Sequence, residues 1–183
     1  MDGQHVRNIH IIMDSSEQEA LGAIQGENLD SLAIDELVGS VAVIDLVTSR
    51  HRIRIKNLQY EQPLKEDGRD YPCLSAAEAD GPVEECRSVP VGGTVVSAAL
   101  VRDRAVWKYE GKEWSILCDT GICIRLEDRV LLIRALDSDE GALAWKIQKE
   151  YVPEEEAPFD WKNKTKNVIR AERELISAAS KRV

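Results

Sequence analysis

The feature that most constrains the fold is a series of short aliphatic runs between Gly92 and Lys149, each ended by a few polar residues. The runs are five to nine residues long, and the polar breaks fall at residues 102–104, 110–112, 119–121, 127–128 and 137–141. Short strands joined by tight polar turns are typical of an antiparallel meander that curls on itself. We therefore predict a small antiparallel barrel or rolled sheet, OB-like or SH3-like, over residues 91–150.

Residues 1–60 predict a strand, a helix and a β-hairpin. The first strand covers residues 5–13, and Ser15 or Ser16 can cap the helix because Gln or Glu follows each of them three places later. The β-branched run VGSVAVIDLV (38–47) and the alternating run HRIRIKNLQY (51–60) then predict two paired strands.

Residues 61–90 have a different composition. They hold four of the six prolines and eight acidic residues against three basic ones, with no apolar period. A structureless loop of this length is unusual inside a compact domain. We predict an acidic, proline-rich loop or linker, and both an ordered surface excursion and a disordered linker remain open.

Residues 151–183 predict an acidic linker followed by a terminal amphipathic helix. Its apolar positions follow a helical spacing: Val168, Ala171, Leu175, Ile176 and Ala179. With the segments above, this gives a β-rich α+β protein, most simply one compact domain in four parts (1–60, 61–90, 91–150 and 151–183).

The charge distribution suggests where a partner would bind. The net charge is −9, but from Phe159 onward seven Lys or Arg stand against three Asp or Glu, so this tail carries +4 and the rest −13. An acidic protein is poorly suited to general nucleic-acid binding. The predicted basic helix is a candidate surface for another protein, through Trp161, Lys162, Lys166, Arg170 and Arg173. The alternative is that this helix covers an open edge of the barrel.

A second candidate surface is a basic strip on the predicted strand after Ser49. Its residues are Arg50, Arg52, Arg54 and Lys56, with Tyr60 as a nearby aromatic. On an OB-like barrel such a strip can follow the backbone of a single-stranded nucleic acid. The simpler interpretation is a solvated strand face.

The segment CDTGIC (118–123) contains two of the four cysteines, Cys118 and Cys123, and predicts a hairpin with both thiols at its mouth. Their spacing is at the loose edge of zinc-binding pairs, and a disulfide or redox pair is also geometrically possible. Cys73 and Cys86 offer no close-spaced second pair. We predict inert thiols, with no metal and no cofactor.

No catalytic motif is present, and His5, His10 and His51 do not converge on a recognisable acid–base arrangement. The leading hypothesis is a non-catalytic interaction or adaptor module; a single-stranded nucleic-acid binder is second and a small enzyme or zinc protein third. The polar N-terminus and the lack of an apolar stretch near about 20 residues predict a cytoplasmic protein without membrane insertion.

Residues 109–147 resemble the soluble OB-fold module of NfeD-type membrane proteins. The matching positions are Gly111, Trp114, Ile124, Val130, Ile133 and Leu143, although Glu127-Asp128 replaces the glycine turn of that family. The resemblance implies a small barrel that acts in protein–protein interaction.

Overall fold

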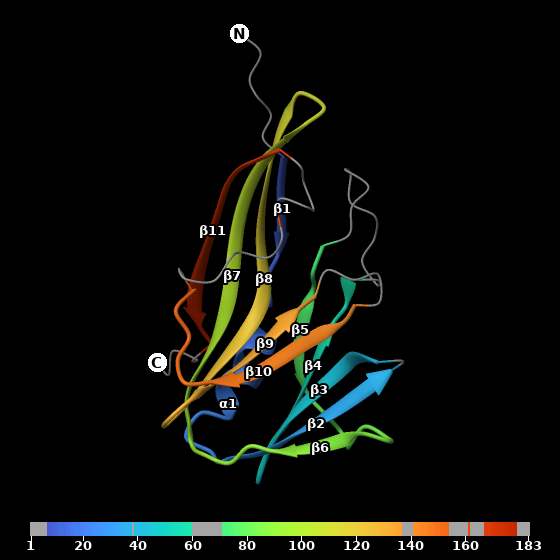
Figure 1. Ribbon diagram of the computed structural model, residues 1–183, viewed down its shortest axis with the longest axis vertical. Coiled ribbons are helices and arrows are strands. Elements are labelled where there is room, and N and C mark those ends of the chain that lie inside the picture. The colour runs from blue at the N-terminus through green and yellow to red at the C-terminus, as the bar shows by residue number, and fades with distance from the viewer. Residues whose placement is uncertain are drawn as a thin grey trace.

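The computed structural model describes residues 7–37, 39–59, 71–136, 141–153, 161 and 167–178. Within these ranges it has eleven strands in one sheet and a single helix (Figure 1). The elements are β1 (Arg7–Ile11), α1 (Ser15–Ala23), β2 (Leu29–Leu37), β3 (Ser40–Thr48), β4 (Arg52–Asn57), β5 (Leu74–Glu78), β6 (Arg87–Pro90), β7 (Val95–Tyr109), β8 (Lys112–Leu126), β9 (Val130–Ala135), β10 (Leu143–Gln148) and β11 (Val168–Ser177). The predicted α+β barrel with a C-terminal helix is therefore wrong, because the protein is mostly β and its sheet is open.

The sheet is one long path with two branches. The path runs β11-β7-β8-β9-β10-β3-β2-β6, with β1 added to β8 and the pair β4 and β5 added to β3. The branch at β8 arises because this strand changes its neighbour along its length: residues 114–118 pair with β1, and residues 121–125 pair with β9. The pairing of β1 with β8 is parallel, and the other strand pairings are antiparallel.

Strands β7 and β8 depart most from the predicted small barrel. Each has 15 residues, so each is roughly 50 Å long, far beyond the strand length of a small barrel. The turns predicted at residues 102–104 and 119–121 are wrong, because both strands continue through them. Arg102, Asp103 and Asp119 in these segments are paired with other charged side chains, as described below, and do not mark turns.

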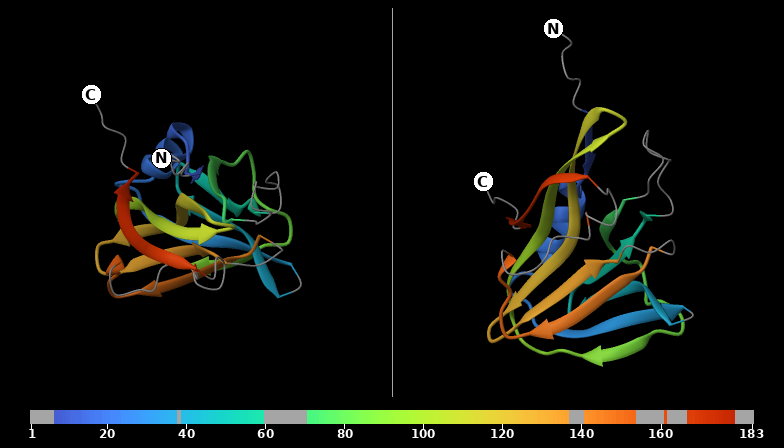
Figure 2. Two further views of the ribbon diagram at one scale, coloured as in Figure 1. Left: turned by 90° about the horizontal axis from the view of Figure 1, so that it is seen from above. Right: turned by 45° about the horizontal axis from the view of Figure 1, so that its top comes forward.

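The upper and lower parts of the molecule share this hairpin (Figure 1). In the upper part, β1 and β11 flank β8 and β7; in the lower part, β9, β10, β3, β2 and β6 continue the sheet and curl below it (Figures 1 and 2). The curl brings the start of β2 beside the start of β7, where the amide of Leu29 donates to the carbonyl oxygen of Gly93 at 3.0 Å. We call these two parts the upper sheet and the lower roll.

A register shift in the hairpin marks the junction of the two parts. It lies between Val101 and Arg102, which pair with Gly121 and Asp119. A side chain at Gly121 would place its Cβ 2.9 Å from the carbonyl oxygen of Ile133 and 3.3 Å from the Cβ of Val101. A glycine is therefore needed where β8 passes closely between β7 and β9.

The lower roll encloses an aliphatic core. Its buried members include Leu32, Ile44, Ile55, Ile124 and Ile133, all fully shielded from solvent. Helix α1 closes one side of this core with Leu21. The helix begins with a capping box formed by Asp14 and Glu17, so its cap lies just before the predicted Ser15 or Ser16.

The upper sheet has a separate aromatic core. Trp107 and Trp114, directly opposite each other on β7 and β8, stack with ring centroids 6.4 Å apart. Tyr71 and Trp161 pack over them from distant parts of the chain, and Ile11 adds an aliphatic side chain from β1.

The predicted C-terminal helix is replaced by β11, which pairs antiparallel with β7 from Val168 to Ser177. Of the apolar residues that matched a helical period, Val168 and Ala171 pack on the aromatic core and Ile176 packs on the aliphatic core. Leu175 is exposed, and Ala179 lies outside the described residues. Tertiary pairing with β7 has overridden the helical period.

Part of the predicted acidic loop 61–90 is also regular. Strands β5 and β6 fall within it, on β4 and β2 respectively. Residues 60–70 lie outside the described ranges.

Candidate functional site

The basic strip on β4 is neutralised by a buried carboxylate. Asp45 on β3 lies directly opposite Arg54 and is completely buried. Its two oxygens accept from Nε and a terminal nitrogen of Arg54, both at 2.9 Å, and Arg52 donates to it at 3.2 Å. The hydrogen bond with Asp45 raises the pKa of the Arg54 guanidinium. A bidentate, charge-assisted pair of this kind leaves little capacity for a phosphate.

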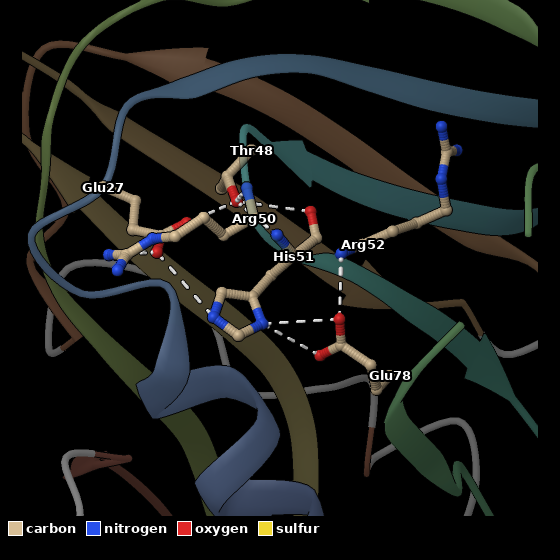
Figure 3. A network of polar contacts seen from close by, with 6 residues as sticks. All are labelled: Glu27, Thr48, Arg50, His51, Arg52 and Glu78. Carbon is tan, nitrogen blue, oxygen red and sulfur yellow. Dashed lines mark hydrogen bonds and ion pairs between the residues drawn. The ribbon is translucent and has the colours of Figure 1, made fainter. Parts of the chain in front are cut away.

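Arg50, at the start of the strip, belongs to a second internal network, centred on Glu27 (Figure 3). The Glu27 carboxylate is buried and accepts from the hydroxyl of Thr48 at 2.5 Å, and the Arg50 guanidinium lies 2.5 Å from it. The Thr48 hydrogen bond, aided by the positive charge of Arg50, lowers the pKa of Glu27 against the opposing effect of burial. Glu27 is therefore held as an anion that fastens the α1–β2 loop to the β3–β4 turn.

His51 lies between two carboxylates in the same network (Figure 3). Its Nδ1 is 3.2 Å from Glu78, whereas its Nε2 is 3.7 Å from Glu27, beyond hydrogen-bond range. The nearby Thr48 hydroxyl is already engaged, since it donates to Glu27 and accepts from the amide of His51 at 2.9 Å. The arrangement offers no activated nucleophile and is explained as a structural latch.

Of the predicted nucleic-acid residues, Arg52 and Arg54 are paired with the buried Asp45. Arg50 is 75% exposed but pairs with the buried Glu27, and Lys56 is exposed. Tyr60 lies outside the described residues. The structure does not assemble the strip as a continuous cationic surface.

Cys118 and Cys123 do not sit at a hairpin mouth, because both lie within the single strand β8. The Cys118 thiol is in the aromatic core and donates to the carbonyl oxygen of Pro72 at 3.3 Å. Burial raises the pKa of Cys118 well above its ordinary range and that of Cys123 to about 11. Both are protonated at neutral pH and are poor metal ligands. Within the described ranges, no cluster of three His, Cys, Asp or Glu side chains could hold a metal ion.

Two of the predicted partner-binding residues are buried around Asp103 on β7. The Asp103 carboxylate accepts from Arg173 on β11 at 2.7 and 2.9 Å, and from the indole nitrogen of Trp161 at 3.1 Å. Asp103 and the side chain of Arg173 are almost fully shielded from solvent. This ion pair anchors β11 to β7, so Arg173 and Trp161 are internal residues.

A similar pair stabilises the junction of the hairpin. Asp119 on β8 accepts from Arg102 at 2.7 and 3.0 Å and from the backbone amide of Met13 at 2.8 Å. Sequence reasoning treated Asp119 and Asp103 as turn residues. For Asp45, by contrast, the sequence does contain a signal. Asp45 lies inside an apolar strand run, and a buried carboxylate requires a cationic partner, which the next strand supplies as Arg52 and Arg54.

The remaining candidate surface is the outer edge of β11, which ends the sheet path of the described residues. Arg170 is 66% exposed and forms an ion pair with Glu172 on the same strand. Ile169 and Leu175 are 57% and 40% exposed, and they are two of the six exposed large apolar side chains among the described residues. Lys162 and Lys166 lie outside the described residues.

A hollow of about 530 Å³ lies beside the middle of β11. It is lined by four consecutive residues of β11, Ala171–Glu174, together with Pro153, Arg102 and Arg104. Arg102 and Arg104 are on β7, opposite Glu174 and Glu172, so the hollow lies over the paired strands β7 and β11 and not along the outer edge. Positive and negative side chains both line it, so it does not favour a simple anion or cation.

Comparison of the chain with protein-family models, with curated proteins and with solved structures finds no match in any of the three. The resemblance to the NfeD-type module is thus not matched by a family model, and the open sheet differs from the barrel it implied. No helix in the described ranges is long and apolar enough to cross a membrane.

Proposed function

We propose that this protein is a non-catalytic interaction module that binds an extended segment of a protein chain along the outer edge of β11. A strand at the end of a sheet presents unpaired backbone groups, and an extended peptide can add to them as a further strand. The single observation that carries the proposal is the exposure of Ile169 and Leu175 on this ten-residue strand.

The buried charges support binding in preference to catalysis. The carboxylates of Asp45, Asp103 and Asp119 are each held by arginine, and Glu27 is held by Thr48 and Arg50. Such groups lack the free proton-transfer capacity that a general acid or base needs. We further propose a reducing, cytoplasmic setting, supported by four cysteines that are all free thiols.

The proposal is tested by affinity capture from a native extract, comparing three forms of the protein. The wild type and an Ile169→Lys/Leu175→Lys variant differ only at the β11 edge. An Ile147→Lys variant is the matched control, because Ile147 is an exposed apolar residue (37%) on β10. We expect protein chains that are captured by the wild type and the control but lost with the β11 variant. Equal capture by all three forms, or no capture, would overturn the proposal.

A further inference from the structure

The sequence of β11 is nearly self-complementary about its centre. Ile169 and Leu175 lie three residues on either side of Glu172, and Arg170 and Glu174 lie two residues on either side. An apolar residue therefore mirrors an apolar residue, and a cation mirrors an anion. This symmetry is what an edge that pairs with itself requires.

Antiparallel pairing of two β11 strands, with Glu172 opposite Glu172 of the second copy, uses both mirrored pairs. Arg170 then faces Glu174 of the second copy, and Ile169, which the register shift beside Val168 leaves without a partner on β7, lies next to its Leu175. Each contact occurs twice by symmetry, and Ala171 faces Arg173, whose guanidinium stays on Asp103 of its own chain. Directly opposite side chains in such a pair lie on the same face of the joined sheet and contact each other. A shift of one residue places Arg170 opposite Arg173 or opposite Leu175, so the neighbouring registers lose the charge match.

The one unfavourable position is the central pair of glutamates. Its cost is offset within each chain, because Glu172 lies opposite Arg104 on β7 and forms an ion pair with Arg170. Glu174 lies opposite Arg102 on β7. Across the joined sheets, the row on each side would thus contain Arg102, Glu174 and Arg170 of the second copy, and the central row would have the two Glu172 side chains between the two Arg104 side chains.

We propose that the chain bound at this edge is a second copy of the protein, in a two-fold dimer joined by antiparallel β11 strands centred on Glu172. The inference rests on the proposed function and names its partner. A single pair of ten-residue strands is a small interface, so we expect a dissociation constant in the micromolar range, on the order of 1–100 µM.

The test is sedimentation velocity of the purified full chain from about 5 to about 500 µM, a range that brackets such a constant. We expect the mass to rise from 20.5 kDa towards twice that value. Arg170→Glu alone places four acidic side chains at the two mirrored positions, and Glu174→Arg alone places four basic ones. Each single variant should dimerise at least roughly ten-fold more weakly.

Mixing the two single variants should restore association, because a chain with two glutamates then faces a chain with two arginines. The Arg170→Glu/Glu174→Arg double variant should also self-associate like the wild type. This rescue excludes loss of folding as the cause of the single-variant effects. Glu172→Gln should strengthen the dimer by roughly two- to five-fold, since it removes the central like-charge contact.

A wild type that stays monomeric over the whole range overturns the inference, as does a dimer that neither single variant weakens. If the protein is monomeric but its captured partners still depend on Ile169 and Leu175, the inference fails and the proposed function stands. If capture is also independent of these residues, both fail.

Discussion

The lower roll and the upper sheet share two strands but are stabilised by different interactions. The core of the lower roll is built mainly from aliphatic side chains of neighbouring strands, such as Ile44 and Ile55 on the β3–β4 hairpin. The core of the upper sheet is aromatic and gathers Tyr71 and Trp161 from distant segments, with the buried Asp103–Arg173 pair beside it. Buried ion pairs occur in both parts, so the difference that matters is in the apolar cores: the aliphatic core comes mainly from adjacent strands, whereas the aromatic core needs side chains from distant segments.

The largest expected effect comes from breaking the polar anchor of the upper sheet. Arg173→Ala leaves Asp103 as an uncompensated buried charge, which typically costs about 3–5 kcal/mol of unfolding free energy. Denaturant unfolding of the wild type and the variant measures this loss of unfolding free energy. Arg170→Ala is the matched control on the same strand, and its exposed ion pair is worth only about 0–1 kcal/mol. Equal losses in the two variants would show that Arg173 is not buried against Asp103.

The junction between the two parts is tested at Gly121. Gly121→Ala forces a Cβ to 2.9 Å from the carbonyl oxygen of Ile133, and such overpacking typically costs about 1–3 kcal/mol. The same denaturant experiment gives the value. Because both parts meet here, we expect the tryptophan fluorescence of the upper sheet and the far-ultraviolet circular dichroism to shift together. An unchanged unfolding free energy in Gly121→Ala would mean that β8 and β9 are not this close.

The lower roll contains a pH-dependent contact at Glu27. Its pKa is lower in the folded protein than the ordinary 4.5, so the unfolded chain takes up a proton first as the pH falls. The contribution of the ionised Glu27 to the unfolding free energy is fully present above about pH 5 and is lost as the pH drops through the pKa of Glu27 in the folded protein. Glu27→Gln should cost about 1 kcal/mol at pH 7.

The stability difference between Glu27→Gln and the wild type should shrink as the pH falls from 7 to 3, because the glutamine does not titrate. Thermal or urea unfolding of both proteins across this range gives the comparison. Parallel stability curves would contradict the assignment of Glu27 as a buried anion.

The smallest expected effect is the reactivity of two buried thiols, which compares the two parts of the molecule without a substitution. Cys118 lies in the aromatic core. Cys123, also on β8, lies in a smaller cluster with Val101 of β7 and Leu132 of β9. Because burial raises the pKa of both thiols, we expect neither to react with a thiol reagent at pH 7 while the protein is folded. Mass spectrometry of labelling over time shows which part opens first. Rapid modification of either cysteine in folded protein would contradict its burial.

The sequence predicted the parts of this fold whose signals are local. The β3–β4 hairpin follows directly from one β-branched run and one alternating run joined by a short turn. The polar residues Arg102, Asp103 and Asp119 were interpreted as turns because their partners are distant in sequence. Nothing local distinguishes a charged turn from a charged pair inside a long strand.

The C-terminal strand was missed for a related reason. The spacing of Val168, Ala171, Leu175 and Ile176 fits a helix, and only pairing with β7 makes it a strand. The candidate site differs from the prediction for the same reason. Arg173, which the sequence placed on the surface, is buried, and Ile169 and Leu175 are exposed. An interaction surface on a sheet edge could not be predicted before the edge itself was known.

The account depends most on β11 lying against β7 with Arg173 buried on Asp103. A double-mutant cycle with Asp103→Ala and Arg173→Ala measures this contact directly through the unfolding free energies of the four proteins. We expect a coupling energy of about 2–3 kcal/mol, the upper range for contacting residues. Additive effects within about 0.5 kcal/mol would contradict the account, because residues that do not touch behave in that way.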